Sequence, residues 1–350
     1  MEHTAVAPAR RSFFRRTAGN YWIKLGVQNA VGLIPGGLGV KANLAVARLV
    51  QGRIEDRPTA ALYRIQRSLR NLALIREHAG LRLGGARVLE LGTGWRGGDV
   101  ALFVVCGAQV TTFDHHQWLE PDSFRHSVKL IRDNLAAVEA EARKHCPDFA
   151  TNLVALEAAC TGGGAIRDIL ARAGVDYRIT HNACPDSIEP VDLLYTESVL
   201  QRLPIGDVAR VLGRALSLLK DTGATFHRID QRDINTLAHV GNGRWALEYL
   251  KYPEWFFRSF ISGRFTSQNR LRESDWLNLL RHSGVAATYI ESRSVDGDAE
   301  RMQAFRPAAR FRHKTAEDMA TRCSLIIGRK GAGGEAVRHR IVASEAEVEG

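Results

Sequence analysis

A glycine-rich turn between two apolar segments dictates the kind of fold available to this sequence. The run from Val88 to Leu91 is strand-like, and it leads directly into the turn Gly92-Thr-Gly-Trp-Arg-Gly97. A helix is expected from Asp99 to Cys106, and a second strand-like run follows and ends on Asp114. This order predicts the first βαβ unit of a doubly wound sheet, in which a nucleoside lies across the carboxyl ends of the strands.

A carboxylate in front of the turn narrows the choice of nucleoside. The spacing of Gly92, Gly94 and Gly97 fits the G-x-G-x-x-G pattern of dinucleotide-binding proteins, and Asp114 is near the spacing of their ribose contact. Glu90, however, stands two residues before the first glycine, where dinucleotide folds usually have an apolar residue. A carboxylate suits the cationic end of a ligand, such as the amino group of a methionine moiety. We therefore favour such a ligand, and a nicotinamide-dependent oxidoreductase is the alternative.

The Glu-x-Gly-x-Gly pattern of residues 90–94 resembles motif I of the class I S-adenosylmethionine-dependent methyltransferases. Further segments resemble later strands of that family, and these are 175–180, 191–197, 224–230 and 322–328. The resemblance covers roughly Leu81 to Lys330, and it departs from the commonest glycine pattern at Arg96. It implies an α/β fold with a doubly wound, seven-stranded Rossmann-like sheet, S-adenosyl-L-methionine as the cofactor, and methyl transfer as the activity.

The resemblance also implies a set of cofactor-binding residues. The backbone of the turn would pack along the homocysteine and ribose of the cofactor, and Asp114 would accept hydrogen bonds from both ribose hydroxyls. Asn182 and Ala183 match the position that meets adenine, and Thr196 lies at the reacting end. The complete set is Glu90, Gly92, Thr93, Gly94, Trp95, Gly97, Asp114, Asn182, Ala183 and Thr196.

A hydroxyl or amine that accepts a methyl group must also lose a proton. His227 or Asp230, near the carboxyl end of the expected fifth strand, is the favoured general base, because a histidine titrates near neutral pH. Glu197, at the mouth of the fourth strand, is a third candidate catalytic residue. His227 can equally be a buried core histidine, and proximity alone can drive transfer from a sulfonium.

Four residues are predicted to bind the acceptor. Arg270 and Arg272 could clamp an anionic group, or they could be exposed charges beside a helix start. Trp245 and Tyr249 belong to an aromatic stretch that lines the acceptor or forms core. The segment Thr-Glu-Ser-Val at 196–199 lacks the Asn/Asp-Pro-Pro-aromatic signature of family members that methylate amino groups of nucleic acids.

We therefore expect direct, in-line transfer to a hydroxyl or amine of a small polar or sugar-like acceptor. Two alternatives keep the same cofactor. One is an enzyme in which a group of the cofactor attacks the cofactor itself, so that the outcome is cyclisation. The other is an RNA-associated methyltransferase that uses a basic N-terminal region.

The chain is predicted to contain three regions, and its charge is unevenly distributed among them. Residues 1–87 hold 15 Lys/Arg against 4 Asp/Glu. These basic side chains either line solvated helix faces or form a patch for a phosphate-bearing partner. Residues 1–80 are predicted to be a helical cap that closes over the cofactor, or else a dimerisation arm. Residues 81–330 form the cofactor-binding domain with a substrate-side insertion at 234–268, and 331–350 are expected to be a disordered tail.

Composition limits the remaining possibilities. No apolar run reaches the length of about 18 residues that a membrane span requires. The five cysteines are scattered along the chain, at residues 106, 146, 160, 184 and 323. This spacing predicts neither a disulfide framework nor a zinc site. His115 and His116 have no carboxylate or cysteine at ligand spacing, so no metal site is predicted. We expect a cytoplasmic protein without a membrane span, and a homodimer is possible.

Overall fold

The chain divides into two compact units. The computed structural model describes residues 21–51, 58–180, 188–236, 244–331 and 333–343. Unit 1 comprises Met1–Glu55, Arg232–Gln268 and Phe305–His313. Unit 2 comprises Asp56–Gln231, Asn269–Ala304 and Lys314–Gly350.

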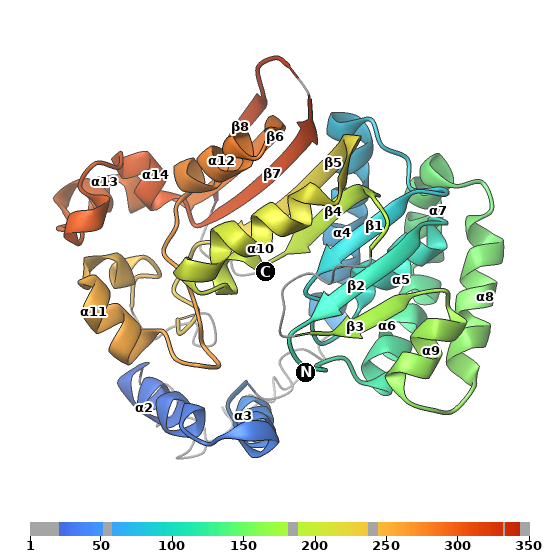
Figure 1. Ribbon diagram of the computed structural model, residues 1–350, viewed down its shortest axis with the longest axis horizontal. Coiled ribbons are helices and arrows are strands. Elements are labelled where there is room, and N and C mark those ends of the chain that lie inside the picture. The colour runs from blue at the N-terminus through green and yellow to red at the C-terminus, as the bar shows by residue number, and fades with distance from the viewer. Residues whose placement is uncertain (1–20, 52–57, 181–187, 237–243, 332, 344–350) are drawn as a thin grey trace, which may run out of the picture. The chain divides into compact units, whose positions relative to one another are not determined.

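Unit 2 is built on an eight-stranded sheet with the strand order β3-β2-β1-β4-β5-β7-β6-β8 (Figure 1). Its strands are β1 (Arg87–Leu91), β2 (Gln109–Asp114), β3 (Asp176–Ile179), β4 (Val191–Glu197), β5 (Leu219–Asp230), β6 (Val285–Val295), β7 (Cys323–Lys330) and β8 (Val337–Ala343). The first five strands pair in parallel, and β7 runs antiparallel to both β5 and β6. This arrangement confirms the doubly wound α/β fold, with one strand more than the seven predicted.

The additional strand is β8, which lies in the segment expected to be a disordered tail. It pairs in parallel with β6, from Tyr289 opposite Val337 to Val295 opposite Ala343. Most side chains of β8 are exposed, and these include the apolar side chains of Val337 and Val342. The hydrogen bonds of β8 to the edge of the sheet therefore stabilise it, and no buried apolar pattern announces it in the sequence.

Helices cover both faces of this sheet. Those of unit 2 are α4 (Pro58–Ala79), α5 (Gly98–Val105), α6 (Pro121–Asp133), α7 (Leu135–His145), α8 (Phe149–Thr161), α9 (Ile166–Arg172), α10 (Ile205–Ser217), α12 (Glu273–His282), α13 (Asp298–Ala304) and α14 (Ala316–Ala320). Helix α10 is typical, because its buried residues Val208, Val211, Leu212 and Ala215 recur at the helical period. Its apolar stripe packs on the sheet and its other side faces water.

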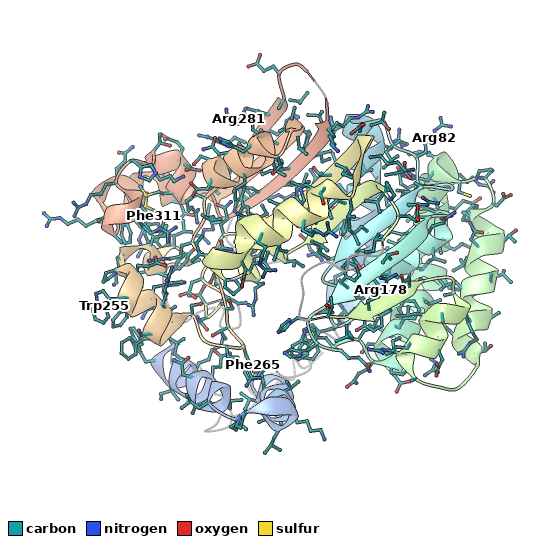
Figure 2. The ribbon with its side chains drawn as sticks, in the orientation of Figure 1. Arg82, Arg178, Trp255, Phe265, Arg281 and Phe311 are labelled. Atoms are coloured by element: carbon teal, nitrogen blue, oxygen red, sulfur yellow. The ribbon has the colours of Figure 1, made fainter. Side chains whose placement is uncertain are left out.

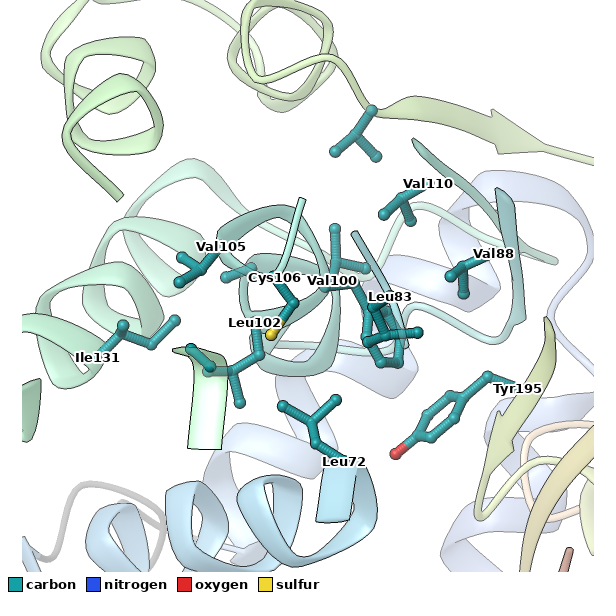
Figure 3. Close-up of a cluster of buried hydrophobic side chains, with 14 of the residues drawn as sticks. Leu72, Leu83, Val88, Val100, Leu102, Val105, Cys106, Val110, Ile131 and Tyr195 are labelled. Atoms are coloured by element: carbon teal, nitrogen blue, oxygen red, sulfur yellow. The ribbon is translucent and has the colours of Figure 1, made fainter. Parts of the chain in front are cut away.

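Alternation along the strands sends neighbouring side chains to two separate cores. One core contains Leu72 of α4, Phe103 of α5 and the strand residues Val88 and Tyr195 (Figure 3). We call the face of the sheet that borders this core the α4 face. The second core packs Leu89 and Leu194 against α10 and against Trp276 of α12, and its side of the sheet is the α10 face.

Unit 1 is helical in the part that the structure describes. Its elements are α2 (Tyr21–Gly32), α3 (Gly36–Gln51), the 3-10 turn η3 (Glu248–Lys251), α11 (Glu254–Phe256), the π-helical turn η4 (Phe257–Ile261) and the 3-10 turn η5 (Ala309–Phe311). A buried hydrogen bond of 2.6 Å from the Tyr21 hydroxyl to Asp233 Oδ2 joins α2 to the second segment. The Arg244 guanidinium lies 4.0 Å from the centre of the Tyr21 ring.

The proposed cap of residues 1–80 spans parts of both units, because α4 packs on α5, α6 and α7 of unit 2. Its closure over the cofactor stays a prediction. No helix in the described ranges has the length and apolar character needed to cross a bilayer.

Replacing Leu72 with alanine is expected to lower the free energy of unfolding by about 2–5 kcal/mol, the range for a buried leucine that leaves a cavity. Leu72 is 1% exposed in the core between α4 and the sheet. Val154→Ala, on the outside of α8 at 59% exposure, is the control and should change stability by about 0.5 kcal/mol or less. Urea unfolding followed by circular dichroism measures both. Equal losses would contradict the packing of α4 on the sheet.

Candidate functional site

The glycine turn follows β1, and its conformation excludes larger residues. Gly92 has a φ of +83°, and a Cβ there would lie 2.3 Å from Cγ2 of Val199. Gly97 has a φ of +62°, and a Cβ there would lie 3.0 Å from Leu119 and Phe124. The turn is therefore a backbone surface at the carboxyl ends of the parallel strands, where this class of sheet binds its ligands.

Asp114, at the end of β2, lies directly against this turn. Its Oδ2 accepts a hydrogen bond of 2.9 Å from the N–H of Gly94, and its Oδ1 accepts one of 2.8 Å from the N–H of His115. Burial raises the pKa of Asp114 to about 6, although these backbone donors act in the opposite direction. The structure thus brings together two parts of the predicted cofactor site.

Glu90 is held inside the sheet by a short chain of hydroxyl groups. Thr112 Oγ1 donates to Glu90 Oε2 at 2.6 Å, and Thr93 Oγ1 lies 2.6 Å from Thr112 Oγ1. Only 3% of Glu90 is exposed. Burial raises the pKa of Glu90 well above its usual range, and the negative charges of Asp99, Asp114 and Glu197 raise it further.

These four carboxylates form what we call the acidic group: Glu90, Asp99, Asp114 and Glu197. Burial and the charge of Glu197 raise the pKa of Asp99, and the Ser68 hydroxyl and Arg67 oppose that rise. A raised pKa means that the folded chain disfavours the ionised carboxylate. The acidic group therefore favours a cation beside the glycine turn.

Two arginine side chains form ion pairs with Glu197. Arg228 Nε lies 3.1 Å from Glu197 Oε2, and Arg67 Nε lies 3.5 Å from Glu197 Oε1. Asn71 Nδ2 donates to Glu197 Oε2 at 3.1 Å, and Asn71 Oδ1 accepts a bond of 2.7 Å from Arg228. Because Arg67 and Asn71 belong to α4, these polar contacts tie that helix to β4 and β5.

The backbone after Glu197 is strained. Ser198 has a φ of 58° and is the non-glycine residue with a positive φ among those the structure describes. Its N–H donates to the carbonyl of Arg228 at 2.9 Å. Such strain persists where surrounding contacts impose it, and it clusters at functional sites.

The strand register places two predicted site residues on the other face of the sheet. Glu197 pairs with Arg228 on the α4 face, whereas the adjacent pair, Thr196 and His227, lies on the α10 face. Thr196 Oγ1 is 2.9 Å from His227 Nδ1, and both residues are fully buried. Burial lowers the pKa of His227 to about 3. These contacts give no support to Thr196 as a cofactor ligand or to His227 as the base.

Asp230, in contrast, shares the α4 face with Arg228 and ends β5. It is half-buried, so part of its surface remains open. Burial lowers the pKa of Arg202 to about 10, and the nearby charge of Asp230 opposes this effect. Asp230 is therefore less buried than His227, the other favoured candidate for the base.

The four predicted acceptor-binding residues are buried. The Arg272 guanidinium donates to the carbonyls of Gln231 at 3.1 Å and Met319 at 2.9 Å, and also to that of Thr321. Arg270 is 1% exposed. Trp245 and Tyr249 lie in the interior of unit 1, where Trp245 meets Phe305 edge to face. None of these contacts supports acceptor binding, which stays a prediction.

Trp95, in the glycine turn, is 42% exposed. Its ring stacks on that of Trp118 with 4.8 Å between centroids, and His116 meets Trp118 edge to face. Asn182 and Ala183, predicted to contact adenine, lie outside the described residues. Within the described ranges, no three His, Cys, Asp or Glu side chains are arranged to hold a metal ion.

The residues that surround Glu197 are not predicted as site residues from the sequence. Asp99 and Arg228 are predicted only as parts of a helix and of a strand. Arg67 belongs to a polar stripe on α4 that repeats at Arg64 and Arg70, beside a stripe of leucines. A charged stripe on a helix that precedes the glycine turn was the available signal.

Comparison with known proteins gives similarity to solved structures alone. A scan against protein-family models finds no match, and a search of curated proteins finds none either. The chain is similar to 1,6-didemethyltoxoflavin-N1-methyltransferase of Burkholderia thailandensis, with 14% identity over 84% of this chain and 88% of that chain and a TM-score of 0.42. It is also similar to magnesium protoporphyrin IX methyltransferase of Synechocystis, with 10% identity, coverage of 83% and 95%, and a TM-score of 0.42. Both of those structures contain S-adenosylhomocysteine.

A third similar structure is an S-adenosylmethionine-dependent methyltransferase of Mesorhizobium loti. The identity is 16%, the match covers 75% of this chain and 96% of that chain, and the TM-score is 0.38.

The buried His227 predicts a measurable pH dependence of stability. Below pH 6.5 the unfolded chain binds a proton at this imidazole, whereas the folded chain does so only near pH 3. The stabilisation is therefore complete above pH 6.5 and is lost as the pH falls. Between pH 7 and pH 5, the parent should lose about 2 kcal/mol more unfolding free energy than His227→Gln.

Urea unfolding at the two pH values measures this difference. His282→Gln, at an exposed histidine of α12, is the matched control and should behave as the parent does. An identical pH dependence in the parent and His227→Gln would contradict a neutral, buried His227.

Proposed function

We propose that this chain is an S-adenosyl-L-methionine-dependent methyltransferase that transfers a methyl group in line to a hydroxyl or amine of a small polar or sugar-like acceptor. The observation that carries the proposal is the acidic group beside the glycine turn. Arg67 and Arg228 balance Glu197, whereas Glu90, Asp99 and Asp114 keep raised pKa values. A ligand with positive charges on both its sulfur and its amino group would relieve that cost.

The residues would divide the binding between them. When bound, S-adenosyl-L-methionine supplies a methyl group on a positively charged sulfur, and the acceptor atom bonds to that carbon as the carbon–sulfur bond breaks. Asp114 would accept the ribose hydroxyls, and Glu90 and Asp99 would stabilise the cationic end of the ligand. The backbone of residues 92–97 would pack along the ligand, with Asn182 and Ala183 at the adenine.

For the proton of the acceptor we propose Asp230 as the base. It ends β5 on the α4 face, where the acidic group lies, and it is half-buried, whereas His227 is sealed on the α10 face. Glu197 already interacts with two guanidinium groups and an amide. We therefore propose Glu197 as a positioning residue, which fixes α4 and β5 at the mouth of the site.

The stacked rings of Trp95 and Trp118 support the sugar-like acceptor. Trp95 directly follows Gly94, whose N–H contacts Asp114. Its exposed ring offers a flat apolar surface beside the cofactor loop, and the apolar face of a sugar or heteroaromatic ring packs well on such a surface. Hydroxyl or amine groups at the edge of that ring would then point to the methyl donor.

Calorimetry is expected to detect binding of S-adenosylhomocysteine and no binding of NAD. Asp114→Asn should weaken the binding of S-adenosylhomocysteine by about 1.5–3 kcal/mol, the range for hydrogen bonds to a charged group. Asp122→Asn, at a carboxylate that is 97% exposed on α6, is the matched control and should bind as the parent does. Binding of NAD alone would exclude the proposed cofactor, and an unchanged affinity of Asp114→Asn would remove Asp114 from the ribose contact.

The affinity for S-adenosylhomocysteine should fall as the pH is lowered through about 6, the pKa of Asp114 in the free chain. The ribose hydroxyls need an ionised carboxylate as acceptor, so protonation competes with the ligand, and the loss approaches tenfold for each pH unit below 6. Above pH 6 the contribution of Asp114 to the affinity should be constant. Titrations of Asp114→Asn at the same pH values should lack this step near pH 6, and a slope equal to that of the parent would assign the effect to another group.

Incubation with S-adenosyl-L-methionine alone tests the reaction type. S-adenosylhomocysteine should form only when an acceptor is added, and formation of methylthioadenosine without acceptor would favour intramolecular cyclisation. With an acceptor, Asp230→Asn should reduce kcat by about 10²–10⁴-fold without a change in S-adenosylhomocysteine affinity. Asp221→Asn, an exposed carboxylate at the opposite end of β5, should leave kcat unchanged. Normal turnover in Asp230→Asn would exclude Asp230 as the base.

A further inference from the structure

Large apolar side chains are exposed mainly in unit 1. Seven of them are between 43% and 85% exposed, and they are Trp22, Ile23, Val27, Leu33, Leu38, Trp255 and Phe260. The much larger unit 2 exposes four comparable residues in its described part, which are Trp95, Val154, Val337 and Val342. Soluble proteins rarely leave apolar side chains gathered at their surface without a binding role.

Contacts between rings join three of these residues, Trp22, Trp255 and Phe260, through Phe256. Phe256 lies between Trp255 and Phe260, with ring centroids 5.6 Å and 5.0 Å away. Trp22 of α2 meets Phe256 edge to face at 6.5 Å. Figure 1 shows α2 near α11, and Figure 2 labels Trp255 on α11.

Hydrogen bonds connect the turn between α2 and α3 to the same segment. Asn29 Nδ2 donates to the carbonyl of Phe260 at 3.0 Å, and Arg264 donates to the carbonyl of Ile34 at 2.9 Å. Leu33 and Leu38 flank this turn and are 85% and 70% exposed. We call α2, the turn and the segment from α11 to η4 the apolar surface.

The net positive charge of the chain lies in unit 1. It holds 16 Lys/Arg against 5 Asp/Glu, a net charge of +11, whereas the whole chain has +10. Between residues 3 and 54 there are eight Lys/Arg and no Asp or Glu. Beside the apolar surface, Glu248 pairs with Arg244 and Lys251, and Glu254 pairs with Arg258 and Arg310.

We propose that the apolar surface of unit 1 docks on an anionic lipid bilayer. Leucine and tryptophan side chains would enter the boundary between headgroups and acyl chains, and the arginines and lysines would face the lipid phosphates. No described helix crosses the bilayer, so the attachment is peripheral.

Two other partners fit the observations less well. A second copy of this surface would bring one charge of +11 against another, which opposes association. A nucleic acid would match the charge, but phosphates and bases would gain little from the aliphatic side chains of Ile23, Val27, Leu33 and Leu38. A bilayer satisfies both the charge and the exposed aliphatic groups.

Co-sedimentation of the full chain with vesicles tests the proposal. Vesicles of phosphatidylcholine and phosphatidylglycerol in equal parts should bind the chain, and vesicles of phosphatidylcholine alone should bind it at least about tenfold more weakly. Added salt should weaken the binding, because it screens the charges. The measurement needs neither cofactor nor acceptor, so its result is independent of the proposed methyl transfer.

The double variant Leu33→Ser with Leu38→Ser should partition into the anionic vesicles at least about tenfold more weakly than the parent. Val154→Ser removes an exposed apolar residue of unit 2 and should bind as the parent does. Unchanged thermal midpoints would show that all variants are folded.

Three results would overturn the proposal. The first is equal binding of the parent to both kinds of vesicle. The second is full binding by the leucine double variant. The third is a parent chain that does not bind vesicles and is a dimer when measured by light scattering, while the double variant is a monomer. That result would assign the surface to a second copy of the chain.

Discussion

The parallel pairing of β1 with β2 on one side and β4 on the other organises unit 2. Glu90 of β1 aligns with Thr112 of β2 and Tyr195 of β4, so three strands end at one edge of the sheet. This alignment determines the positions of the glycine turn, Asp114 and Glu197, since each lies at or just beyond the end of its strand. A shift of β1 by one residue would send Glu90 to the α10 face and disperse the acidic group.

In the proposed function, the acidic group would stabilise the bound ligand at a cost to the stability of the free chain. A carboxylate with a raised pKa contributes stability that is present below its unfolded pKa and lost as the pH rises through its folded pKa. For Asp114 that loss is complete above about pH 6, so at neutral pH the ionised carboxylate of Asp114 lowers the stability of the fold. Arg67, Asn71 and Arg228 contact Glu197 and connect α4 to the sheet.

Much of this could be predicted from the sequence where the determining residues are close together in the chain. The contact of Asp114 with Gly94 spans 20 residues within one βαβ unit, and the strand and turn pattern predicts both residues as parts of one cofactor site. The contact of Asn71 with Arg228 spans 157 residues and depends on how α4 packs on the sheet. No local pattern encodes that packing, so the balance of Glu197 was not foreseen.

The face that a strand residue occupies was equally hard to predict. His227 and Asp230 are three residues apart on β5, and both were candidate bases. Strand alternation separates them, but the assignment of each face to α4 or α10 requires the register with β4. Strand β8 was not predicted for another reason. It is held by hydrogen bonds to the edge of the sheet, and such bonds require no pattern of hydrophobic side chains.

The three-segment construction of unit 1 has a consequence for the order of folding. Tyr21 finds its hydrogen-bond partner in Asp233, 212 residues later, and Trp245 finds its ring contact in Phe305. During synthesis, α2 and α3 therefore leave the ribosome long before the segments that complete their unit, and β1 to β5 are made in between. Unit 1 cannot be isolated by a single cut in the chain. Its last segment ends at His313, so unit 1 can complete its folding only after β1 to β6 have been made, and β7 and β8 of unit 2 are made later still.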